Sequence, residues 1–453
     1  MRMVVIGGGI SGLACAWRLQ QMGVPVLLLE QDDRPGGVIR SLRREGVLFE
    51  AGPQSFLLNA ALDELIHEVG MEDDLLLASP RAARYVVIGG RLRGVPMGPP
   101  ALLFSSLLSA GTKKRLFGEP FSHTVPPEED ESIAAFVRRK FGAELLDRLV
   151  GPMVSGIYAG DPERLSLRSA FPSLHQWEEQ FGSVIRGMMK SRPAGEKRSG
   201  GLAALRNGNE SLAARIAERL GQGFVRRARA LAIRPAAAGS GARYEVECDR
   251  DGRRETIPAG AVVVAAPARA AASLLSGLAP AADSLAGIEY APVAVVGGSY
   301  STEHLPRPLD GFGFLVPRAE RMRVLGTVWN SSLFPGRAPE GQAALTSFVG
   351  GMTDPAASGL PDEALYQTVE SELRRILGIL LAPRVRFAQR WTQAIPQYNL
   401  GHAELIRRVR FALESVPGVF LAGSYLGGPA IGACVETANS AAQQAAASLG
   451  AGT

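Results

Sequence analysis

Glycine and acidic residues near the N-terminus have types and spacing that suit phosphate and sugar recognition. Gly7, Gly9 and Gly12 form a G-x-G-x-x-G pattern, and Glu30 follows further along the chain. In this pattern the first glycine permits a tight turn, the second lets backbone approach a pyrophosphate, and the third lets a helix pack closely on a strand. An acidic residue placed like Glu30 hydrogen-bonds a ribose hydroxyl and disfavours a 2′-phosphate. The spacing therefore predicts a dinucleotide site.

The elements that position these residues are a strand, a helix and a second strand. Residues 3–6 are apolar and suit a buried parallel strand, a helical pattern continues to Leu19, and residues 26–29 form a second apolar strand. The helix N-terminus would direct its free N–H groups and positive dipole end at the phosphates. The candidate contacts here are Gly7, Gly8, Gly9, Ile10, Ser11, Gly12, Glu30 and Gln31.

A second glycine pair, Gly36-Gly37, follows Arg34 and indicates more backbone pressed against an extended ligand. Glu30 followed by Arg34 and this pair resembles the extended FAD signature of the flavin amine oxidase superfamily. The resemblance implies a noncovalently bound FAD. It also implies further cofactor contacts at Val38, Gly52, Pro53, Gln54, Ser55, Ala230, Trp391, Gly423, Pro429, Ala430 and Ile431.

The C-terminal end has a similar strand, turn and helix pattern. Residues 419–423 predict a short strand, residues 424–432 a glycine-rich turn, and residues 433–449 an Ala-rich helix. In flavoproteins of this architecture, that helix N-terminus lies near the pyrimidine part of the isoalloxazine, where its dipole stabilises reduced flavin. A terminal helix that only packs on the sheet is the alternative. We expect Cys434 to be a small packing residue, not a point of covalent flavin attachment.

Three further segments narrow the resemblance: Tyr158-Ala159-Gly160-Asp161-Pro162, Gly311-Phe312-Gly313 and Ile395-Pro396-Gln397-Tyr398. With them, nearly all 453 residues resemble the oxygen-dependent protoporphyrinogen oxidase family, FAD enzymes of the penultimate step of heme synthesis. The resemblance implies a six-electron oxidation of a porphyrinogen by three hydride transfers to flavin, each followed by reoxidation with O2 and release of H2O2. No motif demands a general base, so we assign no catalytic acid or base.

The resemblance also implies a substrate cavity on the flavin face, bounded by Ala159, Gly160, Leu315 and Leu325. Leucines above and below suit a large, flat, apolar macrocycle. Arg93 corresponds to an arginine that pairs with a substrate propionate in several members, and a guanidinium matches a carboxylate bidentately. From the sequence alone, a solvated charge on a hairpin around Gly89-Gly90 is the alternative for Arg93.

Three competing functions remain open. A coproporphyrinogen oxidase would share fold and flavin but take a four-carboxylate substrate, and the few basic residues in the cavity motifs favour the two-propionate substrate. The porphyrinogen-type motifs argue against a flavin amine oxidase. A noncatalytic relative, such as the prenyl-GTPase dissociation inhibitors, would lack FAD, and the intact Gly36-Gly37 pair argues against it.

Composition limits the class of protein and its partners. Hydrophobic content of 46% and charged content of 21% describe a globular chain, and a net charge of +5 without a dense basic run argues against nucleic acid. The three cysteines lie far apart in the sequence, which fits a reducing compartment. Neither they nor the five histidines show the spacing of metal ligands. The chain starts almost at its first strand, leaving no room for a leader, so we expect a cytoplasmic protein. The assembly stays open, with a homodimer as one candidate.

Residues 101–110 are apolar over most of a helical circumference and are followed by Lys113, Lys114 and Arg115. Such a helix is too short to span a bilayer, but it could lie in a lipid interface with its cations at headgroup level, on the inner face of the cell membrane. The alternative is a helix that covers the core or a substrate cavity.

These patterns predict an α/β protein with a discontinuous Rossmann-like FAD-binding domain, a mixed-sheet substrate domain and a helical, membrane-contacting subdomain. A buried strand at 261–267 would return to the nucleotide-binding sheet, and a segment at 192–201 rich in Gly, Lys and Arg suggests a mobile connection. The predicted division is FAD-binding parts at 1–90, 196–268 and 391–453, a helical subdomain at 91–195 and a mixed-sheet domain at 269–390.

Overall fold

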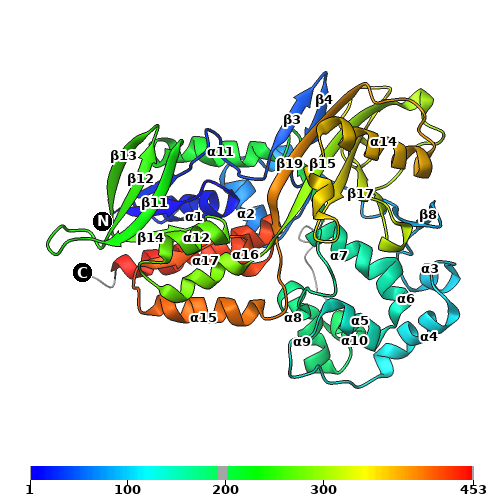
Figure 1. Ribbon diagram of the computed structural model, residues 1–453, viewed down its shortest axis with the longest axis horizontal. Coiled ribbons are helices and arrows are strands. Elements are labelled where there is room, and N and C mark those ends of the chain that lie inside the picture. The colour runs from blue at the N-terminus through cyan, green and yellow to red at the C-terminus, as the bar shows by residue number, and fades with distance from the viewer. Residues whose placement is uncertain (1, 192–200, 451–453) are drawn as a thin grey trace.

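The computed structural model describes residues 2–191 and 201–450. One half of the molecule contains a parallel five-stranded sheet, the other half contains a mixed seven-stranded sheet, and a group of helices lies beside the mixed sheet (Figure 1). The predicted α/β class is confirmed. The predicted connection at 192–201 lies, except for Gly201, outside the described residues.

The parallel sheet has the strand order β10-β2-β1-β14-β20. Its strands are β1 (Met3–Ile6), β2 (Val26–Leu29), β10 (Phe224–Val225), β14 (Ala261–Val264) and β20 (Val419–Leu421). They are apolar because both faces of the sheet are covered. Met3 and Val5 join the core on one face, whereas Val4 and Ile6 join the core on the other. The predicted return of the 261–267 segment to this sheet is confirmed by β14, which pairs with β1.

Helices cover one face of this sheet, and helices with a small sheet cover the other. The first face packs against α1 (Ile10–Gln21), α2 (Ala60–Glu68), α11 (Glu210–Leu220) and α17 (Ile431–Gly450). The second face packs against α12 (Ala268–Leu275), α15 (His402–Glu414) and the antiparallel strands β11 (Ala228–Pro235), β12 (Tyr244–Arg250) and β13 (Arg253–Ala259). Two further small sheets pair β3 (Ser41–Arg44) with β4 (Val47–Glu50), and β9 (Leu202–Leu205) with β5 (Phe56–Leu57) and β6 (Leu75–Leu77).

The mixed sheet has the order β19-β15-β18-β17-β16-β7-β8 and is antiparallel except where β16 meets β7. Its strands are β7 (Arg84–Ile88), β8 (Arg91–Gly94), β15 (Tyr290–Ser301), β16 (Gly313–Leu315), β17 (Val324–Trp329), β18 (Gln342–Gly350) and β19 (Val385–Pro396). Helix α14 (Asp362–Leu377) packs on one face. The opposite face packs partly against β4 and the end of α7, where Val47, Phe49 and Ala159 join its core.

The structure divides the chain differently from the sequence at three places. The hairpin of β7 and β8 belongs to the mixed sheet, so a boundary between residues 90 and 91 falls in its turn. Residues 269–288, which include most of α12, pack in the core on the second face of the parallel sheet, although they were predicted to belong to the mixed-sheet domain. Strand β19 runs across the predicted boundary at 390. These corrections have one cause: strand partners and core partners lie far apart in sequence.

The helical subdomain lies beside the mixed sheet (Figure 1). It contains α3 (Pro99–Phe104), α4 (Ala110–Gly118), α5 (Ile133–Lys140), α6 (Ala143–Leu145), a π-helical turn (Leu146–Val150), α7 (Gly151–Tyr158), α8 (Leu167–Ala170), α9 (Pro172–Phe181) and α10 (Val184–Lys190). Across residues 2–191 and 201–450, the helices are too short or too polar for any one of them to cross a bilayer.

The single helix expected over residues 101–110 is wrong. Helix α3 ends at Phe104, and α4 begins at Ala110. The Ser105 hydroxyl accepts a hydrogen bond from the Leu107 amide and turns the chain, while Ser109 caps α4. Leu107 and Leu108, each 3% exposed, therefore point into the subdomain and not toward a lipid surface.

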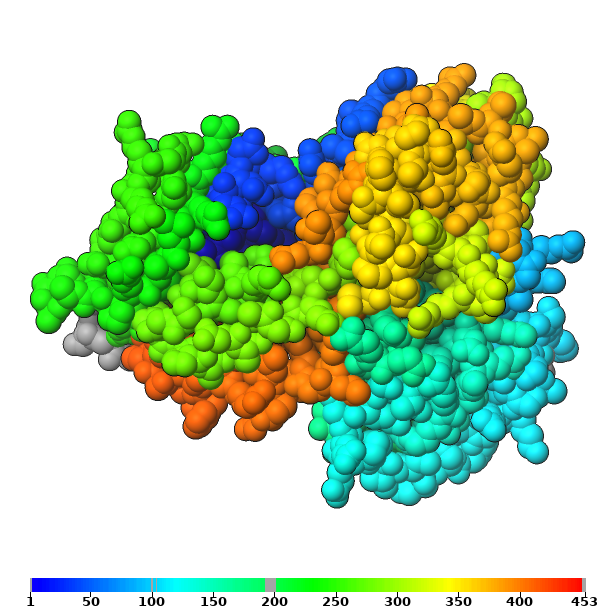
Figure 2. All heavy atoms as spheres, viewed as in Figure 1, coloured from blue at the N-terminus to red at the C-terminus, as the bar shows by residue number. Residues whose placement is uncertain are grey.

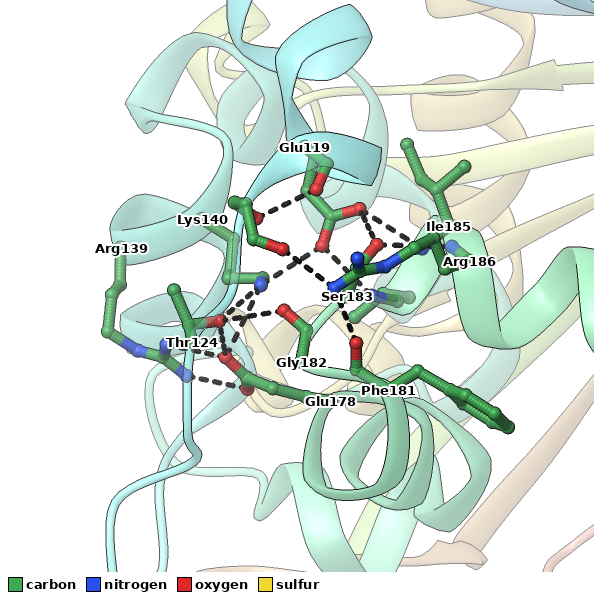
Figure 3. Close-up of polar contacts among 12 residues, drawn as sticks. Glu119, Thr124, Arg139, Lys140, Glu178, Phe181, Gly182, Ser183, Ile185 and Arg186 are labelled. Carbon is green, nitrogen blue, oxygen red and sulfur yellow. Dashed lines mark hydrogen bonds and ion pairs between the residues drawn. The ribbon is translucent and has the colours of Figure 1, made fainter.

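A buried ionic cluster holds the subdomain together (Figure 3). Lys140 Nζ lies 3.0 Å from a Glu119 carboxylate oxygen and 3.4 Å from Glu178, and Arg139 donates two hydrogen bonds to Glu178. Glu119 also accepts from the backbone N–H groups of Val184 and Ile185 at the start of α10. The cluster thereby joins the start of α10 and the end of α9 to α5.

Candidate functional site

The first glycine pattern forms the tight strand-to-helix turn that its spacing predicts. Gly7 has a φ of +108°, and a Cβ atom built on Gly12 would lie 1.8 Å from the Gly7 carbonyl oxygen. Neither position accepts a side chain without moving the backbone. A Cβ on Gly9 would meet nothing within 4 Å, so the backbone here faces open space at the N-terminus of α1. Ile10 and Ser11 are buried in the first turn of that helix.

Glu30 lies at the end of β2 and contacts the glycine turn. Its carboxylate accepts hydrogen bonds from the Gly8 amide at 2.5 Å and from the Asp32 amide at 2.8 Å. Burial raises the pKa of Glu30, and the two amide hydrogen bonds oppose that rise. Because each carboxylate oxygen has two lone pairs, both can still accept from a sugar hydroxyl.

The second glycine pair lies against the first. Gly36 pairs with Gly9 in an isolated bridge and donates its N–H to the Gly8 carbonyl at 2.8 Å. Arg34 stiffens this loop because its guanidinium donates to the carbonyls of Gly37 and Ile39 and pairs with Glu210 at 3.3 Å. The two glycine patterns therefore form one loop pair, as the sequence predicted.

A buried ion pair continues this network toward the mixed-sheet side of the molecule. Glu50 and Arg337, each 1% exposed, approach to 3.0 Å, and Glu50 also accepts from the Ser41 hydroxyl at 2.6 Å. Ser41 in turn accepts from the Glu210 amide and donates its own amide to the Glu210 carboxylate. A continuous chain of polar contacts thus runs from Arg337 to the Gly36-Gly37 loop.

The segment from Gly52 to Ser55 lies beside Val38. A Cβ atom on Gly52 would lie 1.9 Å from the Val38 carbonyl oxygen. Trp391 donates its indole N–H to the Ala51 carbonyl at 2.6 Å, which brings strand β19 to the same place. The structure therefore brings these predicted cofactor residues together: Val38, Gly52, Pro53, Gln54, Ser55 and Trp391.

Two further predicted cofactor residues, Gln31 and Ala230, lie near Glu30 at the end of β2. Gln31 follows it directly and is exposed. The Ala228 amide donates to the Glu30 carbonyl at 2.7 Å, and Ala230 lies two residues further along β11 at an irregularity in its pairing with β12. This places Ala230 and Gln31 around the end of β2, where the Glu30 carboxylate lies.

The C-terminal turn packs beside the first glycine pattern, because α17 lies against α1 on the same face of the sheet. Gly423 has a φ of +146°, α16 (Ser424–Gly427) follows, and α17 begins at Ile431 after Pro429 and Ala430. Cys434 is 4% exposed, and burial raises the pKa of its thiol to about 11. A thiol that stays protonated is a poor nucleophile, in agreement with the predicted packing role.

Figure 2 shows that the surface is hollowed between the green three-stranded sheet and the orange and yellow mixed sheet. The blue N-terminal segment lies at the floor of this hollow. The residues above fit a dinucleotide such as FAD on three counts: open space over Gly9, a fixed carboxylate at Glu30, and the N-termini of α1 and α17 on one side of the sheet.

The four residues predicted to bound a substrate cavity come together where α7 meets the mixed sheet. Ala159 ends α7 in a left-handed conformation with a φ of +45°. A Cβ on Gly160 would lie 2.6 Å from Gln397 Oε1. From the sheet, Leu315 reaches Gly156 of α7 and Leu325 reaches Gly351, which packs against Ala159. The residues from α7 and those from the sheet are all apolar, and both leucines are partly exposed.

Arg93 lies in line with this wall. Leu315 pairs with Val86, and Val86 pairs with Arg93, so the three residues form one row across β16, β7 and β8. Paired residues in a sheet project to the same face. Arg93 is exposed at the outer edge strand, about 10 Å from Leu315 at roughly 4.8 Å per strand. It therefore stands at the rim of the apolar wall, and its binding role stays a prediction.

Sequence reasoning missed the supporting residues. Arg337, Ser41 and Glu210 carry no local signal, because their partners are distant in sequence and only the folded sheet order brings them together. Tyr398 belongs to one of the motifs that narrow the resemblance, but no role was predicted for it. Among the described residues, no group of three or more His, Cys, Asp and Glu side chains is arranged to hold a metal ion.

Comparisons with known proteins agree with this geometry. Residues 10–449 match the family described as flavin containing amine oxidoreductase. The chain is 34% identical to protoporphyrinogen oxidase 1, chloroplastic, of Spinacia oleracea, over 97% of this chain and 83% of the relative. It is 31% identical to coproporphyrinogen III oxidase of Bacillus subtilis, over 98% and 97% of the two chains.

Solved structures share the fold over the whole length. A crystal structure of an Exiguobacterium protein superposes with a TM-score of 0.83, at 28% identity and 99% coverage of both chains. Cyclohexylamine oxidase from Brevibacterium oxydans superposes with a TM-score of 0.74, at 19% identity and 99% coverage of both chains, which speaks for the fold alone.

Proposed function

The chain belongs to the flavin-containing amine oxidoreductase family, and we propose that it oxidises a porphyrinogen, with protoporphyrinogen IX as the main substrate. The protein is an FAD-dependent oxidoreductase. FAD held at Gly9, Glu30 and the Gly36-Gly37 pair would supply the hydride acceptor for such an oxidation, with O2 as the final oxidant. The observation that carries the proposal is the apolar wall of Leu315 and Leu325 opposite Ala159-Gly160, with Arg93 in the same row of the sheet.

The wall suits a flat macrocycle. Two partly exposed leucines lie beside a turn whose residues have little or no side chain, and such an apolar surface suits contact with a planar apolar ring. The four residues of this wall carry no titratable side chain. They therefore orient the substrate and exclude water, and they do not exchange protons with it.

Arg93 would receive a propionate at the rim. A carboxylate held by an exposed guanidinium still gains a charged, bidentate contact, which fixes the edge by which the ring enters. Replacing Arg93 by alanine should raise KM roughly tenfold and leave kcat unchanged, because the contact is the same in ground state and transition state. Arg407→Ala, an exposed arginine on α15, is the matched control. Unchanged KM for Arg93→Ala would remove this assignment.

The direct test is porphyrin fluorescence after mixing the FAD-loaded protein in air with freshly reduced protoporphyrinogen or coproporphyrinogen. A higher kcat/KM for protoporphyrinogen supports the proposal. Fluorescence from neither substrate, with FAD bound, would overturn it and favour an amine substrate. A protein that cannot be loaded with FAD would overturn the enzymatic function altogether.

Coproporphyrinogen is the second candidate, because the Bacillus subtilis relative that carries this activity in its name is covered almost completely. Its four carboxylates need more cations than Arg93 supplies. Arg91 lies two residues before Arg93 on the same strand and is also exposed. If coproporphyrinogen is the preferred substrate, Arg91→Ala should raise its KM as well, whereas the KM for protoporphyrinogen should depend on Arg93 alone.

We also propose that the outer surface of the helical subdomain rests on a membrane. Phe104 and Phe121 are 86% and 87% exposed, and Phe117 on α4 is 40% exposed close to Lys114. Aromatic rings with neighbouring cations suit the interface of an anionic bilayer. Cosedimentation with phosphatidylglycerol vesicles should exceed that with phosphatidylcholine vesicles and fall in a Phe104→Ser/Phe121→Ser variant. Equal sedimentation of both proteins would refute the contact.

A further inference from the structure

The segment after β19 has no role in the site described so far, although it contacts both the turn at Ala159-Gly160 and the C-terminal glycine turn. Gln397 is 2% exposed and donates from its amide to the Tyr158 carbonyl at 2.9 Å, directly before Ala159 and Gly160. The Tyr398 carbonyl accepts from the Ser166 amide at 2.8 Å. One side of the segment is therefore bound to the turn that faces the substrate wall.

The other side of the segment is bound to the C-terminal glycine turn. The Tyr398 hydroxyl donates to the Ser424 carbonyl at 2.5 Å and accepts from the Gly428 amide at 2.7 Å. One oxygen thus spans both ends of the turn that precedes α17, and it uses its donor and an acceptor position. Gly423 and Gly428 both have a positive φ. Glycine restricts its own backbone little, so the conformation of this turn depends on such contacts.

Aromatic packing holds the tyrosine in place. Its ring is stacked on His402 at 4.2 Å between centroids and 10° between planes, and Tyr158 packs against it at 5.9 Å. His402 is buried, and its Nε2 lies 2.9 Å from the Tyr425 carbonyl within the same turn. Burial lowers the pKa of His402, so the ring stays neutral and donates to that carbonyl. Tyr398 and His402 therefore fasten the turn from one side at three backbone groups.

We propose that Tyr398 is a positioning residue, which fixes the approach of the α17 N-terminus to the flavin while Gln397 fixes the substrate turn. The proposal rests on the proposed function for its placement of flavin and porphyrinogen. The last residues before α17 are Pro429 and Ala430, which were predicted to contact the cofactor. A loosened turn would move the positive end of the helix dipole relative to the flavin and stabilise its reduced, anionic form less.

The test is Tyr398→Phe, which removes both hydrogen bonds of the hydroxyl but keeps the stacked ring. The FAD dissociation constant should rise roughly tenfold, because two hydrogen bonds in the turn are lost. The midpoint potential should fall, and a tenfold loss of preference for reduced flavin corresponds to about 30 mV for a two-electron couple. With a porphyrinogen, kcat should fall while KM stays unchanged.

Tyr425→Phe is the matched control. Tyr425 lies in the same turn and is 1% exposed, but its hydroxyl has no hydrogen-bond partner among the described residues. Tyr244→Phe controls for the loss of a tyrosine hydrogen bond elsewhere, since its hydroxyl donates to the Pro417 carbonyl at 2.8 Å. Both should keep the FAD affinity and the potential of the unmodified protein. If Tyr398→Phe also keeps both and loses only thermal stability, the positioning role is refuted.

Should Tyr398→Phe fail to fold, His402→Phe keeps the ring stack and removes only the contact with the Tyr425 carbonyl. It should change FAD affinity and potential in the same direction by a smaller factor, and no change in either would refute the role. A protein that binds FAD but oxidises no porphyrinogen would end the proposed function, whereas FAD affinity and potential would still test Tyr398.

Discussion

Replacing Arg337 by methionine should destabilise the protein strongly, although Arg337 lies outside the predicted binding residues. Arg337 and Glu50 are each 1% exposed, and their charged atoms are 3.0 Å apart. Removing one partner of a buried pair leaves an uncompensated charge and costs about 3–5 kcal/mol. Glu50 keeps two neutral donors, the Ser41 hydroxyl and the Asn209 amide, so we expect about 3 kcal/mol, the lower end of this range.

The assay is urea unfolding of the FAD-free protein, with matched variants beside it. Arg215→Met removes an exposed pair with Glu218 and should cost less than about 0.5 kcal/mol. Combining Arg337→Met with Glu50→Gln removes both charges and should recover much of the loss, because no buried charge is left unpaired. If Arg337→Met costs no more than Arg215→Met, the argument from desolvation is refuted.

The same variant should acquire a pH dependence of known sign. Burial already raises the pKa of Glu50, and the Arg337 charge opposes that rise. Without Arg337 the pKa rises further, so the folded state binds a proton that the unfolded state releases. A raised pKa contributes stability at low pH that is lost as pH increases. Arg337→Met should therefore be less destabilised at pH 5 than at pH 8, and a pH-independent loss would contradict this account.

Two other predictions follow from single contacts. Gly160→Ala would place a Cβ 2.6 Å from Gln397 Oε1, so KM for the porphyrinogen should rise while the FAD content of the purified protein stays the same; lost FAD would show a wider disturbance. Burial opposes ionisation of Glu178, but hydrogen bonds from Arg139 and Thr124 lower its pKa to about 2, so its contribution to stability should be lost as pH falls from about 4.5 toward 2. In acid unfolding monitored by circular dichroism, Glu178→Gln should be less stable than the unmodified protein at pH 6 and nearly equal to it at pH 2, and parallel curves would contradict the assignment.

The local elements of the nucleotide-binding half were predictable from the sequence. The strand at 3–6, the helix that continues through Leu19 and the strand at 26–29 all form as predicted, because their apolar periodicity and their glycines act over a few residues. The helix at 101–110 failed for a local reason too. Two serines whose hydroxyls accept backbone N–H groups outweighed the apolar pattern there.

The site itself depends on distances that no local pattern reports. Arg93 shares a row with Leu315 only because β16 joins β7 in parallel, and this pairing links residues 229 positions apart, as for Leu315 and Val86. A shift of the pairing by one residue would turn Arg93 to the opposite face. Under the proposed function, the discrimination between two and four substrate carboxylates would therefore depend on strand register at the rim, since the leucine wall would contact any tetrapyrrole ring alike. In a Leu92→Arg variant the new side chain would project to the face that α14 covers, so the KM for porphyrinogen should stay unchanged. The native Arg91 and Arg93 project to the opposite face, where they can meet a substrate carboxylate.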